Sequence, residues 1–465
     1  MVRRHRSAGR LAMGSATAGL ALAAGLVALT GPWDGGQRAA ERDQATAADL
    51  VRGQLPAERL AGTVPAAPAV LSPLDGSAAA PSPQALTRTL TPLLEADALG
   101  DEATGSVVDV ATGDVLFERG ATEGHAPAST VKVLTAVAAL DALGPEHRLT
   151  TRTVVDADGE RVYLVGGGDT TLTANDLQGL ADRTARALAD RGVESVRVAY
   201  DVSAYPAETH PIGVNSNIAP IVPLQVNAGR LDDSDHGPAD RSTDPARDAA
   251  EAFAERLTTA GIEVDGRVGE RTAPDSAEGL AEHRSAPVAS LVERMLTDSD
   301  NDLAEALARM TALASDEPGT ARGLSRALTS RAEALGAPLD SVRIVDASGL
   351  DRDGRVSAGL LTAVLAAAAD PGRPELRPAL TGLPVAGFTG TLSNRYAEGD
   401  GADGAGVVRA KTGTLTGVNT LAGTATTADG RVLAFAFMAA DTQDAQAAQE
   451  ALDVAASALA ETSAG

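Results

Sequence analysis

The chain has 465 residues, enough for two or three domains, and 44% hydrophobic residues with 48 glycines are typical of a globular protein. Its formal net charge of −24 argues against nucleic acid and anionic membrane surfaces as partners, because both repel an acidic chain. The absence of cysteine excludes disulfides, zinc–thiolate sites and thiol nucleophiles.

The N-terminal segment has the pattern of an export signal. Four arginines between residues 3 and 10 precede an uncharged run from Leu11 to Trp33. A basic start followed by an apolar stretch is typical of a secretory signal or of an uncleaved anchor. We therefore expect residues 1–34 to be a signal peptide or signal anchor, and the protein to be extracytoplasmic, either secreted or held at the cytoplasmic membrane.

Residues 35–82 are rich in Ala and Pro without sustained periodicity, which predicts a linker. Residues 83–148 begin an ordered domain. Leucine spacing predicts a helix first, two β-rich runs around the turn at Ala111–Asp114 predict a hairpin, and a hydrophobic helix follows.

Two further regions complete the predicted organisation. Residues 149–271 alternate short strands with two amphipathic helices, as in a self-contained α+β module. Residues 272–465 contain helices, two strands joined near Ala428–Gly430, and a closing alanine-rich helix. Strands near both ends of the ordered region indicate a mixed α/β domain, with an antiparallel sheet between helices, that is interrupted by an inserted α+β domain.

Only two of the 39 basic residues are lysines, Lys132 and Lys411. Lys132 lies three residues after Ser129 at the start of a predicted helix, so both side chains share one face. Lys411 opens the sequence Lys-Thr-Gly-Thr at the start of a predicted strand. A partly buried lysine can lose its proton near neutral pH, whereas arginine cannot, and a neutral amine beside a serine is a general base.

A third polar motif lies between the two lysines. Ser299-Asp300-Asn301 falls in a stretch predicted to be helical, and the serine hydroxyl and asparagine amide are expected to point into a shared cleft. Ser-x-x-Lys alone is a weak motif and Ser-Asp-Asn alone is an ordinary polar helix end, but the three motifs in this order are specific.

The set Ser-x-x-Lys, Ser-x-Asn and Lys-Thr-Gly resembles the signature of penicillin-binding proteins and serine β-lactamases. Longer stretches resemble the D-alanyl-D-alanine carboxypeptidase/endopeptidase branch, the low-molecular-mass class C (type-4-like) penicillin-binding proteins. The stretches lie at Tyr163–Leu172, Met295–Leu307, Val345–Ser357, Leu383–Arg395 and Val408–Ala425. The resemblance covers about 84–441 and implies a penicillin-binding-protein/β-lactamase-like transpeptidase fold.

The resemblance also implies roles for individual residues. Ser129 would be the nucleophile toward the carbonyl between two D-alanines, and Lys132 its base. Ser299 would relay a proton, and Asn301 would orient Lys132 and bind the substrate amide. Lys411, remaining charged, would bind the substrate carboxylate. The substrate-binding residues would be completed by Thr412, Gly413 and Thr414, with the oxyanion held by the backbone N–H groups of Ser129 and Thr414.

Substrates implied by the resemblance are peptidoglycan stem peptides ending in D-Ala-D-Ala, and β-lactams would be covalent inhibitors. The balance between carboxypeptidase and endopeptidase activity stays open. Two alternatives remain: a serine β-lactamase, although neither a Glu-x-x-Leu-Asn loop nor a Tyr-x-Asn motif occurs, and a catalytically silent cell-wall binding protein. One departure is Thr170, where the family pattern leads us to expect proline.

Other kinds of site find little support. The six histidines show no paired metal-binding spacing, and no Gly-x-Ser-x-Gly elbow occurs. We expect His125 to be a structural loop residue and Asp169 to be a turn former. No metal or organic cofactor is predicted.

Overall fold

The fold is seen in a computed structural model, in which residues 79–462 are described. The expected signal segment, 1–34, and all but the last residues of the expected linker, 35–82, lie outside this part. Within the described residues, no helix is both long enough and apolar enough to cross a bilayer.

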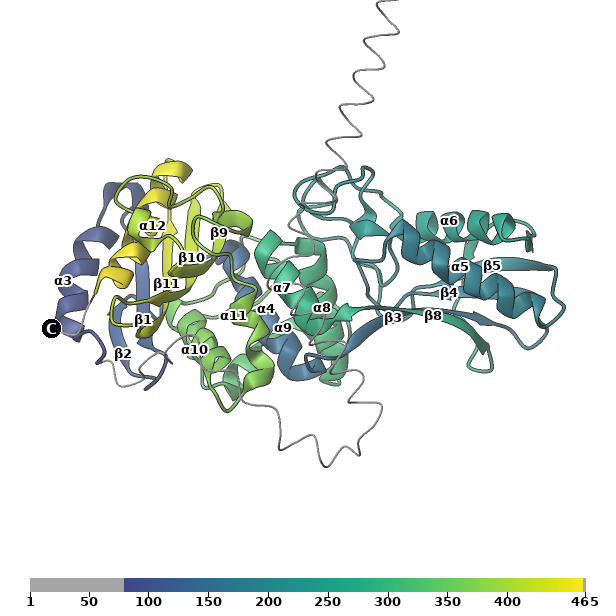
Figure 1. The fold of residues 1–465 in the computed structure, drawn as a ribbon, viewed down its shortest axis with the longest axis horizontal. Coiled ribbons are helices and arrows are strands. Elements are labelled where there is room, and N and C mark those ends of the chain that lie inside the picture. Colours follow the sequence, from purple (N-terminus) through teal and green to yellow (C-terminus); the bar gives the residue numbers. More distant parts are fainter. Residues whose placement is uncertain (1–78, 463–465) are drawn as a thin grey trace, which may run out of the picture. The chain divides into compact units, whose positions relative to one another are not determined.

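The first sheet joins the two ends of the described chain (Figure 1). Its five strands are antiparallel and follow the order β2-β1-β11-β10-β9. The β1–β2 pair is the predicted hairpin, and β10–β11 is the predicted pair of late strands. The bounds are β1 Thr104–Asp109, β2 Val115–Arg119, β9 Val408–Leu415, β10 Val418–Thr426 and β11 Val432–Ala440.

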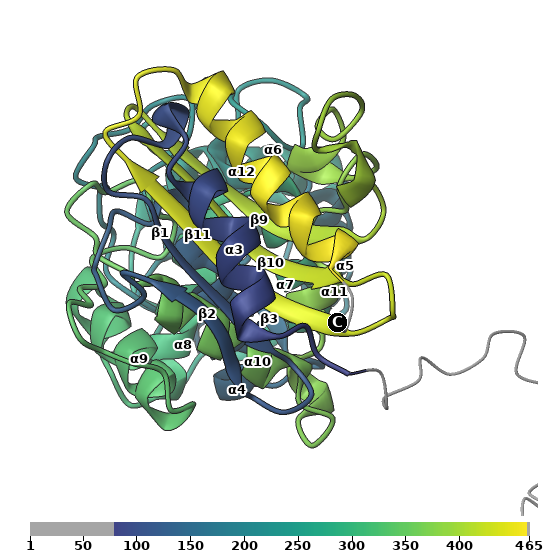
Figure 2. The same ribbon diagram turned by 90° about the vertical axis from the view of Figure 1, so that its left-hand side faces the viewer.

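Strand β11 shows why this sheet lies between helices. Successive side chains of a strand point to opposite faces, so an alternating set of apolar residues fills two cores. Phe435 and Phe437 pack with the leucines of α3 and α12, which lie over one face of the sheet in Figure 2. Ala434, Ala436 and Met438 face the second core, formed with α4, α7, α8, α9 and α10. The strand is therefore buried on both faces.

The helices of this domain come from both sides of the insertion. Their bounds are α3 Pro83–Leu94, α4 Val131–Leu143, α7 Val288–Asp298, α8 Asn301–Ala314, α9 Ala321–Ala334, α10 Ala358–Ala369, α11 Pro378–Thr381 and α12 Ala445–Glu461. Short 3₁₀ turns occur at η2 Asp97–Leu99, η3 Ala128–Thr130, η5 Pro374–Leu376, η6 Gly390–Leu392 and η7 Ala402–Gly404.

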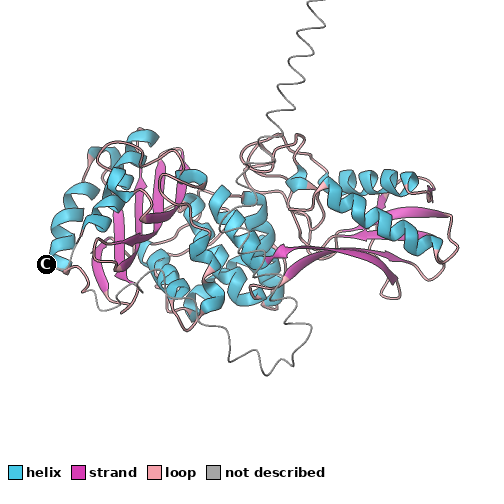
Figure 3. Ribbon diagram, in the orientation of Figure 1, coloured by secondary structure: helices cyan, strands magenta, loops and turns pink. Residues whose placement is uncertain are grey.

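The second sheet belongs to the inserted region, and Figure 3 shows the strands as two separate groups. Its order is β6-β5-β4-β3-β8, with β7 also paired to β5 and with parallel pairing between β4 and β5. The helices α5 and α6 pack on it around Phe253, Leu177 and Leu180. The bounds are β3 Arg148–Val155, β4 Arg161–Val165, α5 Ala174–Ala189, β5 Ser195–Asp201, η4 Asn227–Gly229, α6 Pro245–Thr259, β6 Glu263–Val264, β7 Gly269–Glu270 and β8 Glu278–Pro287.

The architecture confirms the predicted mixed α/β fold with an inserted α+β domain. The insertion was expected over 149–271, but its sheet also contains β8, which pairs with β3 beyond that limit. The sequence of β8, Glu278–Pro287, carries three charged side chains and no β-branched residue, so its strand character comes from pairing with β3 and not from local propensity.

Candidate active site

Ser129 lies in the turn η3, directly before α4. The turn is fastened to the first sheet, because Pro127 O accepts hydrogen bonds from Thr130 Oγ1 at 2.6 Å and from Thr420 Oγ1 at 2.9 Å. Ala128, inside the turn, has a φ of 46°, a conformation that residues other than glycine rarely adopt. Ser129 therefore lies in a turn whose backbone is strained at Ala128 and which is hydrogen-bonded to β10.

Lys132 lies one turn further on, in the first turn of α4, and is fully buried. Its Nζ lies 2.9 Å from Ser129 Oγ, 2.7 Å from Asn301 Oδ1 and 2.6 Å from Ser348 O. The first contact confirms the geometry expected from helical spacing. As a neutral amine, Lys132 would keep two N–H bonds to Asn301 and Ser348 and would turn its lone pair toward Ser129.

Burial lowers the pKa of Lys132 to about 8 from its ordinary value of 10.5. Four nearby carboxylates act in the opposite direction by favouring the charged form; they are Asp346, Asp300, Glu305 and Asp302. The balance leaves an amine that can exchange its proton close to neutral pH, as a general base requires.

Ser299 lies at a break between two helices, where we expected a continuous helix. Helix α7 ends at Asp298, Ser299 is left-handed with φ 59° and ψ 37°, and Asp300 caps α8 by accepting from Leu303 N at 2.9 Å. Aspartate is a favoured N-cap because its side chain satisfies a free N–H of the first turn. The left-handed Ser299 thus ends α7, and the Asp300 cap begins α8.

Asn301 begins α8 and uses both ends of its amide. Its Oδ1 accepts from Lys132 Nζ, while its Nδ2 donates to Asn217 O of the inserted domain at 3.0 Å. Because the acceptor end faces an amine and the donor end faces a carbonyl, the amide orientation follows from the network. The asparagine therefore joins the general-base candidate to the inserted domain.

Lys411 is also fully buried, in β9, and its Nζ donates to Thr412 O at 2.8 Å. Burial, and secondarily the positive charge of Lys132, lowers the pKa of Lys411 well below its ordinary value. Among the described residues no carboxylate pairs with Lys411. The sequence led us to expect a charged amine here; burial opposes that charge, and an anionic partner would favour it.

Gly413 brings β9 against the turn that carries Ser129. A Cβ placed on Gly413 would lie 2.1 Å from Thr420 Oγ1 and 2.9 Å from Pro127 O. Only glycine fits at this distance. Thr412 Oγ1 bonds to Thr391 Oγ1 at 2.8 Å, and the exposed Thr414 bonds to Gln449 Nε2 at 3.2 Å.

The N–H of Thr414 points away from the sheet. Strand β9 is an edge strand, and Ala410 N donates outward to Pro384 O at 3.0 Å. Neighbouring residues of a strand direct their N–H groups to opposite edges, so Thr414 shares the outward edge with Ala410. This orientation suits an oxyanion hole at the open edge.

A cavity of about 300 Å³ brings residues of all three motifs together. Ser129, Ser299, Asn301 and Thr414 line it, whereas Lys132, Lys411, Thr412 and Gly413 are not among its lining residues. The opposite wall comes from the inserted domain and includes Asn217, Arg230, His236 and Arg241. The insertion is therefore part of the site.

The loop that carries Ser348 and Gly349 also contributes to the site, although no motif predicted a role for it. Ser348 contributes only its carbonyl oxygen, which no motif can reveal. A Cβ on Gly349, whose φ is 79°, would lie 1.7 Å from Ala128 O, so this loop touches the backbone next to the nucleophile. The Ser-Gly pair within Val345–Ser357 was the available signal.

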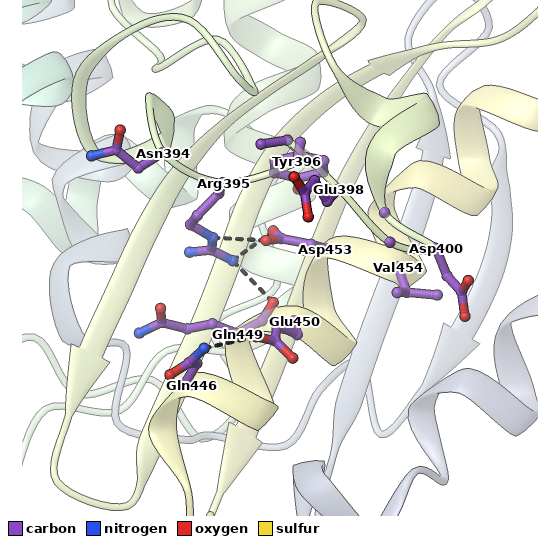
Figure 4. Close-up of a pocket in the computed structure, with 13 residues that line it drawn as sticks. Asn394, Arg395, Tyr396, Glu398, Asp400, Gln446, Gln449, Glu450, Asp453 and Val454 are labelled. Atoms are coloured by element: carbon purple, nitrogen blue, oxygen red, sulfur yellow. Dashed lines mark hydrogen bonds and ion pairs between the residues drawn. The ribbon is translucent and has the colours of Figure 1, made fainter.

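A larger cavity, of about 590 Å³, lies beside α12 and the segment at 394–401 (Figure 4). Arg395 and Asp453 both line this cavity, and the Arg395 guanidinium donates to both carboxylate oxygens of Asp453, at 2.8 and 2.6 Å (Figure 4). Arg395 also donates to Gln449 O at 3.1 Å, and Gln449 in turn contacts Thr414. None of the predicted site residues lines this cavity, whose charged wall supports the end of β9.

Comparison with known proteins decides the family. A model of the D-Ala-D-Ala carboxypeptidase 3 (S13) family matches residues 86–234 and 232–459. The chain belongs to the S13 family. Carboxypeptidase DacB of Mycolicibacterium smegmatis is a relative of this S13 protein, 38% identical over 387 residues that cover 79% of this chain and 82% of the relative.

Two further relatives extend the comparison. The D-alanyl-D-alanine carboxypeptidase of Actinomadura sp. is 30% identical over 452 residues, which cover 78% of the S13 chain and 82% of the relative. Penicillin binding protein 4 (dacB) from Haemophilus influenzae has the same fold, with a TM-score of 0.62 at 22% identity over 80% of this chain and 97% of that one.

These matches confirm the family expected from the three motifs. The S13 protein is an enzyme, a serine-type D-Ala-D-Ala carboxypeptidase among the peptidases. Its fold is that of a low-molecular-mass penicillin-binding protein. The named relatives favour the carboxypeptidase over the alternative of a serine β-lactamase.

Proposed function

We propose that this S13 carboxypeptidase cleaves the D-Ala-D-Ala bond of peptidoglycan stem peptides through an acyl-enzyme on Ser129. The observation that carries the proposal is the position of Lys132 Nζ, 2.9 Å from Ser129 Oγ, with two further acceptors holding its other hydrogens. An amine in this setting takes a proton from the hydroxyl as the oxygen attacks. The basic, apolar N-terminal segment supports an extracytoplasmic location, where such peptides occur.

In the acylation step, Ser129 would attack the carbonyl carbon of the D-Ala-D-Ala bond. Ser129 Oγ forms a bond to the carbonyl carbon while its proton moves to Lys132 Nζ. The oxyanion is held by the N–H groups of Ser129 and Thr414, which cost no reorganisation during the reaction. The C–N bond then breaks, and the leaving D-alanine amine receives a proton relayed through Ser299, which shares the cavity with Ser129.

Deacylation would use the same groups in reverse. A water molecule gives a proton to the base and attacks the ester carbon, the bond to Ser129 Oγ breaks, and the serine regains its proton. Lys411, which lacks a carboxylate partner among the described residues, would pair with the C-terminal carboxylate of the substrate, assisted by the hydroxyls of Thr412 and Thr414. Binding of that carboxylate places the scissile bond over Ser129.

Penicillin sensitivity is part of the proposal. A β-lactam carries a carboxylate and a strained amide, so it would acylate the same serine. The penicillin binding protein 4 of H. influenzae, which shares the fold, has been solved in complex with a β-lactam.

Intact-mass analysis with benzylpenicillin tests this function. The wild-type protein should gain the mass of one penicillin, and Ser129→Ala should gain none and release no D-alanine from a D-Ala-D-Ala peptide. Ser276→Ala, an exposed serine of the inserted domain, is the matched control and should behave as wild type. Covalent labelling of Ser129→Ala would overturn the assignment.

Digestion of purified muropeptides then separates the two peptidase activities. Loss of a terminal D-alanine identifies a carboxypeptidase reaction, whereas conversion of cross-linked dimers into monomers identifies an endopeptidase reaction. Mass spectrometry of the products resolves both on the same sample.

A further inference from the structure

The loop at 346–351 supplies the third acceptor of the general-base candidate. Ser348 O accepts from Lys132 Nζ at 2.6 Å, and Ala347 O accepts from Thr135 Oγ1 of α4 at 3.0 Å. A shift of this loop would therefore move an oxygen that orients Lys132. What holds the loop in place also holds the amine against Ser129.

Two buried carboxylates hold the loop through its backbone. Glu305 Oε1, from α8, accepts from Ala347 N at 2.9 Å and Ser348 N at 3.0 Å. Asp346 Oδ2 accepts from Ser348 Oγ at 2.9 Å, Leu350 N at 2.8 Å and Asp351 N at 3.0 Å. Hydrogen bonds to a charged acceptor are stronger than neutral ones, so these two groups define the path of the loop.

The inserted domain reaches this loop through His210. The ring is buried, with 4% of the residue exposed, and its Nε2 lies 3.0 Å from Asp346 Oδ2. Ile212 N donates to Nδ1 at 3.4 Å, which places the ring hydrogen on Nε2 in the neutral form. Nε2–H therefore donates to the carboxylate that organises the loop.

His210, Glu305 and Asp346 also lie close enough together to suggest metal ligands. Their acceptor atoms are already engaged: Glu305 Oε2 pairs with Arg309 Nη1 at 2.7 Å, and Asp346 Oδ2 takes the bonds described above. A guanidinium beside the cluster disfavours a second cation. The cluster is better explained as a hydrogen-bonded support.

The inserted domain also makes polar contacts with α8. Asp302 Oδ1 accepts from Ala219 N at 2.8 Å, and Asp302 Oδ2 pairs with the buried Arg241 at 3.2 Å. Asn301 Nδ2 donates to Asn217 O. His210 thus belongs to a docked surface, where it makes the hydrogen bond to the 346–351 loop while Leu350 packs against Ile218 and Ile221.

We propose that His210 is a positioning residue, through which the inserted domain fixes the 346–351 loop and so holds Lys132 Nζ against Ser129 Oγ. The inference rests on the proposed role of Lys132 as the base. Without the imidazole donor, Asp346 would keep a buried charge with one bond fewer, and its backbone contacts to the loop would loosen. Ser348 O would then no longer hold Lys132 in line with the hydroxyl.

Several charged groups face His210 and shift the pKa of its imidazole. The net effect of Asp346, Glu305 and Asp351 is to raise the pKa of His210, although burial alone would lower it. In return, the hydrogen bond from His210 helps to lower the pKa of Asp346 against its burial. Arg309, on the other side of Glu305, remains charged. Asp346 is the foremost of the carboxylates that raise the pKa of Lys132, so the loss of a hydrogen bond at this carboxylate should change the pKa of that amine.

The test is the rate of acylation by a fluorescent penicillin as a function of pH. His210→Leu should acylate about 10- to 100-fold more slowly, because small displacements of a catalytic group have large effects, and the midpoint of its rising limb should differ from that of wild type. His210→Gln, whose amide N–H can reach the position of Nε2, should recover most of the rate. His147→Leu, an exposed histidine, is the matched control and should match wild type.

The outcomes separate this inference from the proposed function. Failure of wild-type protein to label would remove the proposed function itself. Labelling of a folded His210→Leu variant with wild-type rate and pH profile would overturn only the role of His210, as would slower labelling with an unmoved limb, which indicates a purely structural role. If His210→Leu does not fold, the comparison of His210→Gln with the shorter His210→Asn decides, and equal rates for those two would contradict the proposal.

Discussion

Lys132 and Asn301 lie 169 positions apart in the chain, and a hydrogen bond of 2.7 Å joins Nζ of the first to Oδ1 of the second. Asn301 in turn is held by Asn217 O of the inserted domain. With Ser348 O as a further acceptor, two hydrogens of the amine are directed away from Ser129. The third position of Nζ is thereby left for the serine hydroxyl, which is the arrangement that proton transfer requires.

Replacing the buried amine tests this arrangement. Lys132→Met keeps the length of the side chain and removes the base, and Lys132→Arg keeps a charge that cannot be lost near neutral pH. We expect the acylation rate with a fluorescent penicillin to fall by about 10²- to 10⁴-fold in both. Thermal unfolding shows whether each variant is folded, and a folded Lys132→Met that labels at the normal rate would rule out Lys132 as the base.

The pKa of Lys132 predicts a pH dependence. Burial lowers it to about 8, so below that pH the amine is protonated and cannot accept the serine proton. The acylation rate should rise with pH, with a midpoint near 8, and level off above it. A rate that stays constant between about pH 6 and about pH 9 would contradict the assignment.

The lowered pKa of Lys132 also makes the free energy of unfolding depend on pH. Between about 8 and 10.5 the unfolded chain binds a proton at Lys132 that the folded protein does not, so the contribution of this group to the free energy of unfolding increases with pH. Lys132→Met should flatten that part of the pH dependence. Chemical denaturation of both proteins over this range measures it.

Substrate binding should be accompanied by proton uptake. Burial and the charge of Lys132 lower the pKa of Lys411, and a bound carboxylate would raise it again. Titration calorimetry of Ser129→Ala with a D-Ala-D-Ala peptide, in two buffers of different ionisation enthalpy at neutral pH, should give different apparent enthalpies. The C-terminal amide of the same peptide is the control, and equal enthalpies for the free acid would show that Lys411 does not gain a proton.

Gly413 tests the contact between β9 and the nucleophile turn. In Gly413→Ala the new methyl would approach Thr420 Oγ1 to 2.1 Å, so β9 must move away from η3. We expect a loss of stability of about 1–3 kcal/mol, typical of overpacking, and a loss of penicillin labelling. Gly279→Ala, in β8 with no atom within 4 Å of the new Cβ, should have neither effect.

Turnover of nitrocefin separates the carboxypeptidase from a β-lactamase. Acylation of Ser129 should produce one burst of product per enzyme molecule, followed by slow release. This outcome agrees with the S13 family match. Fast continuous turnover would instead support the β-lactamase alternative.

The sequence predicted the parts of the site that depend on side-chain identity. Ser129 and Lys132 were paired by helical spacing, and the rarity of lysine drew attention to Lys411. Features made by the backbone were not predictable. Ser348 acts through a carbonyl that every residue has, and the left-handed Ser299 breaks a stretch whose residues favour a helix.

Pairing between segments that are distant in the chain could not be predicted from the sequence either. Strand β8 lacks a strong β pattern of its own and exists because β3 pairs with it. The burial of Lys411, which lowers the pKa of that amine, could not be predicted for a related reason, since it is decided by tertiary packing. The contact of His210 with Asp346 joins residues 136 positions apart, and no local pattern marks it.

The position of β1 between β2 and β11 has a consequence for biosynthesis. The second sheet uses the continuous stretch from β3 to β8, so it can form while the rest of the chain is still being made. The first sheet cannot close around β1 until residues 432–440 have been synthesised. Ser129 and Lys132 are therefore synthesised well before β9 and β11, so the sheet edge that carries Lys411 and Thr414 can form beside them only after those strands have been made.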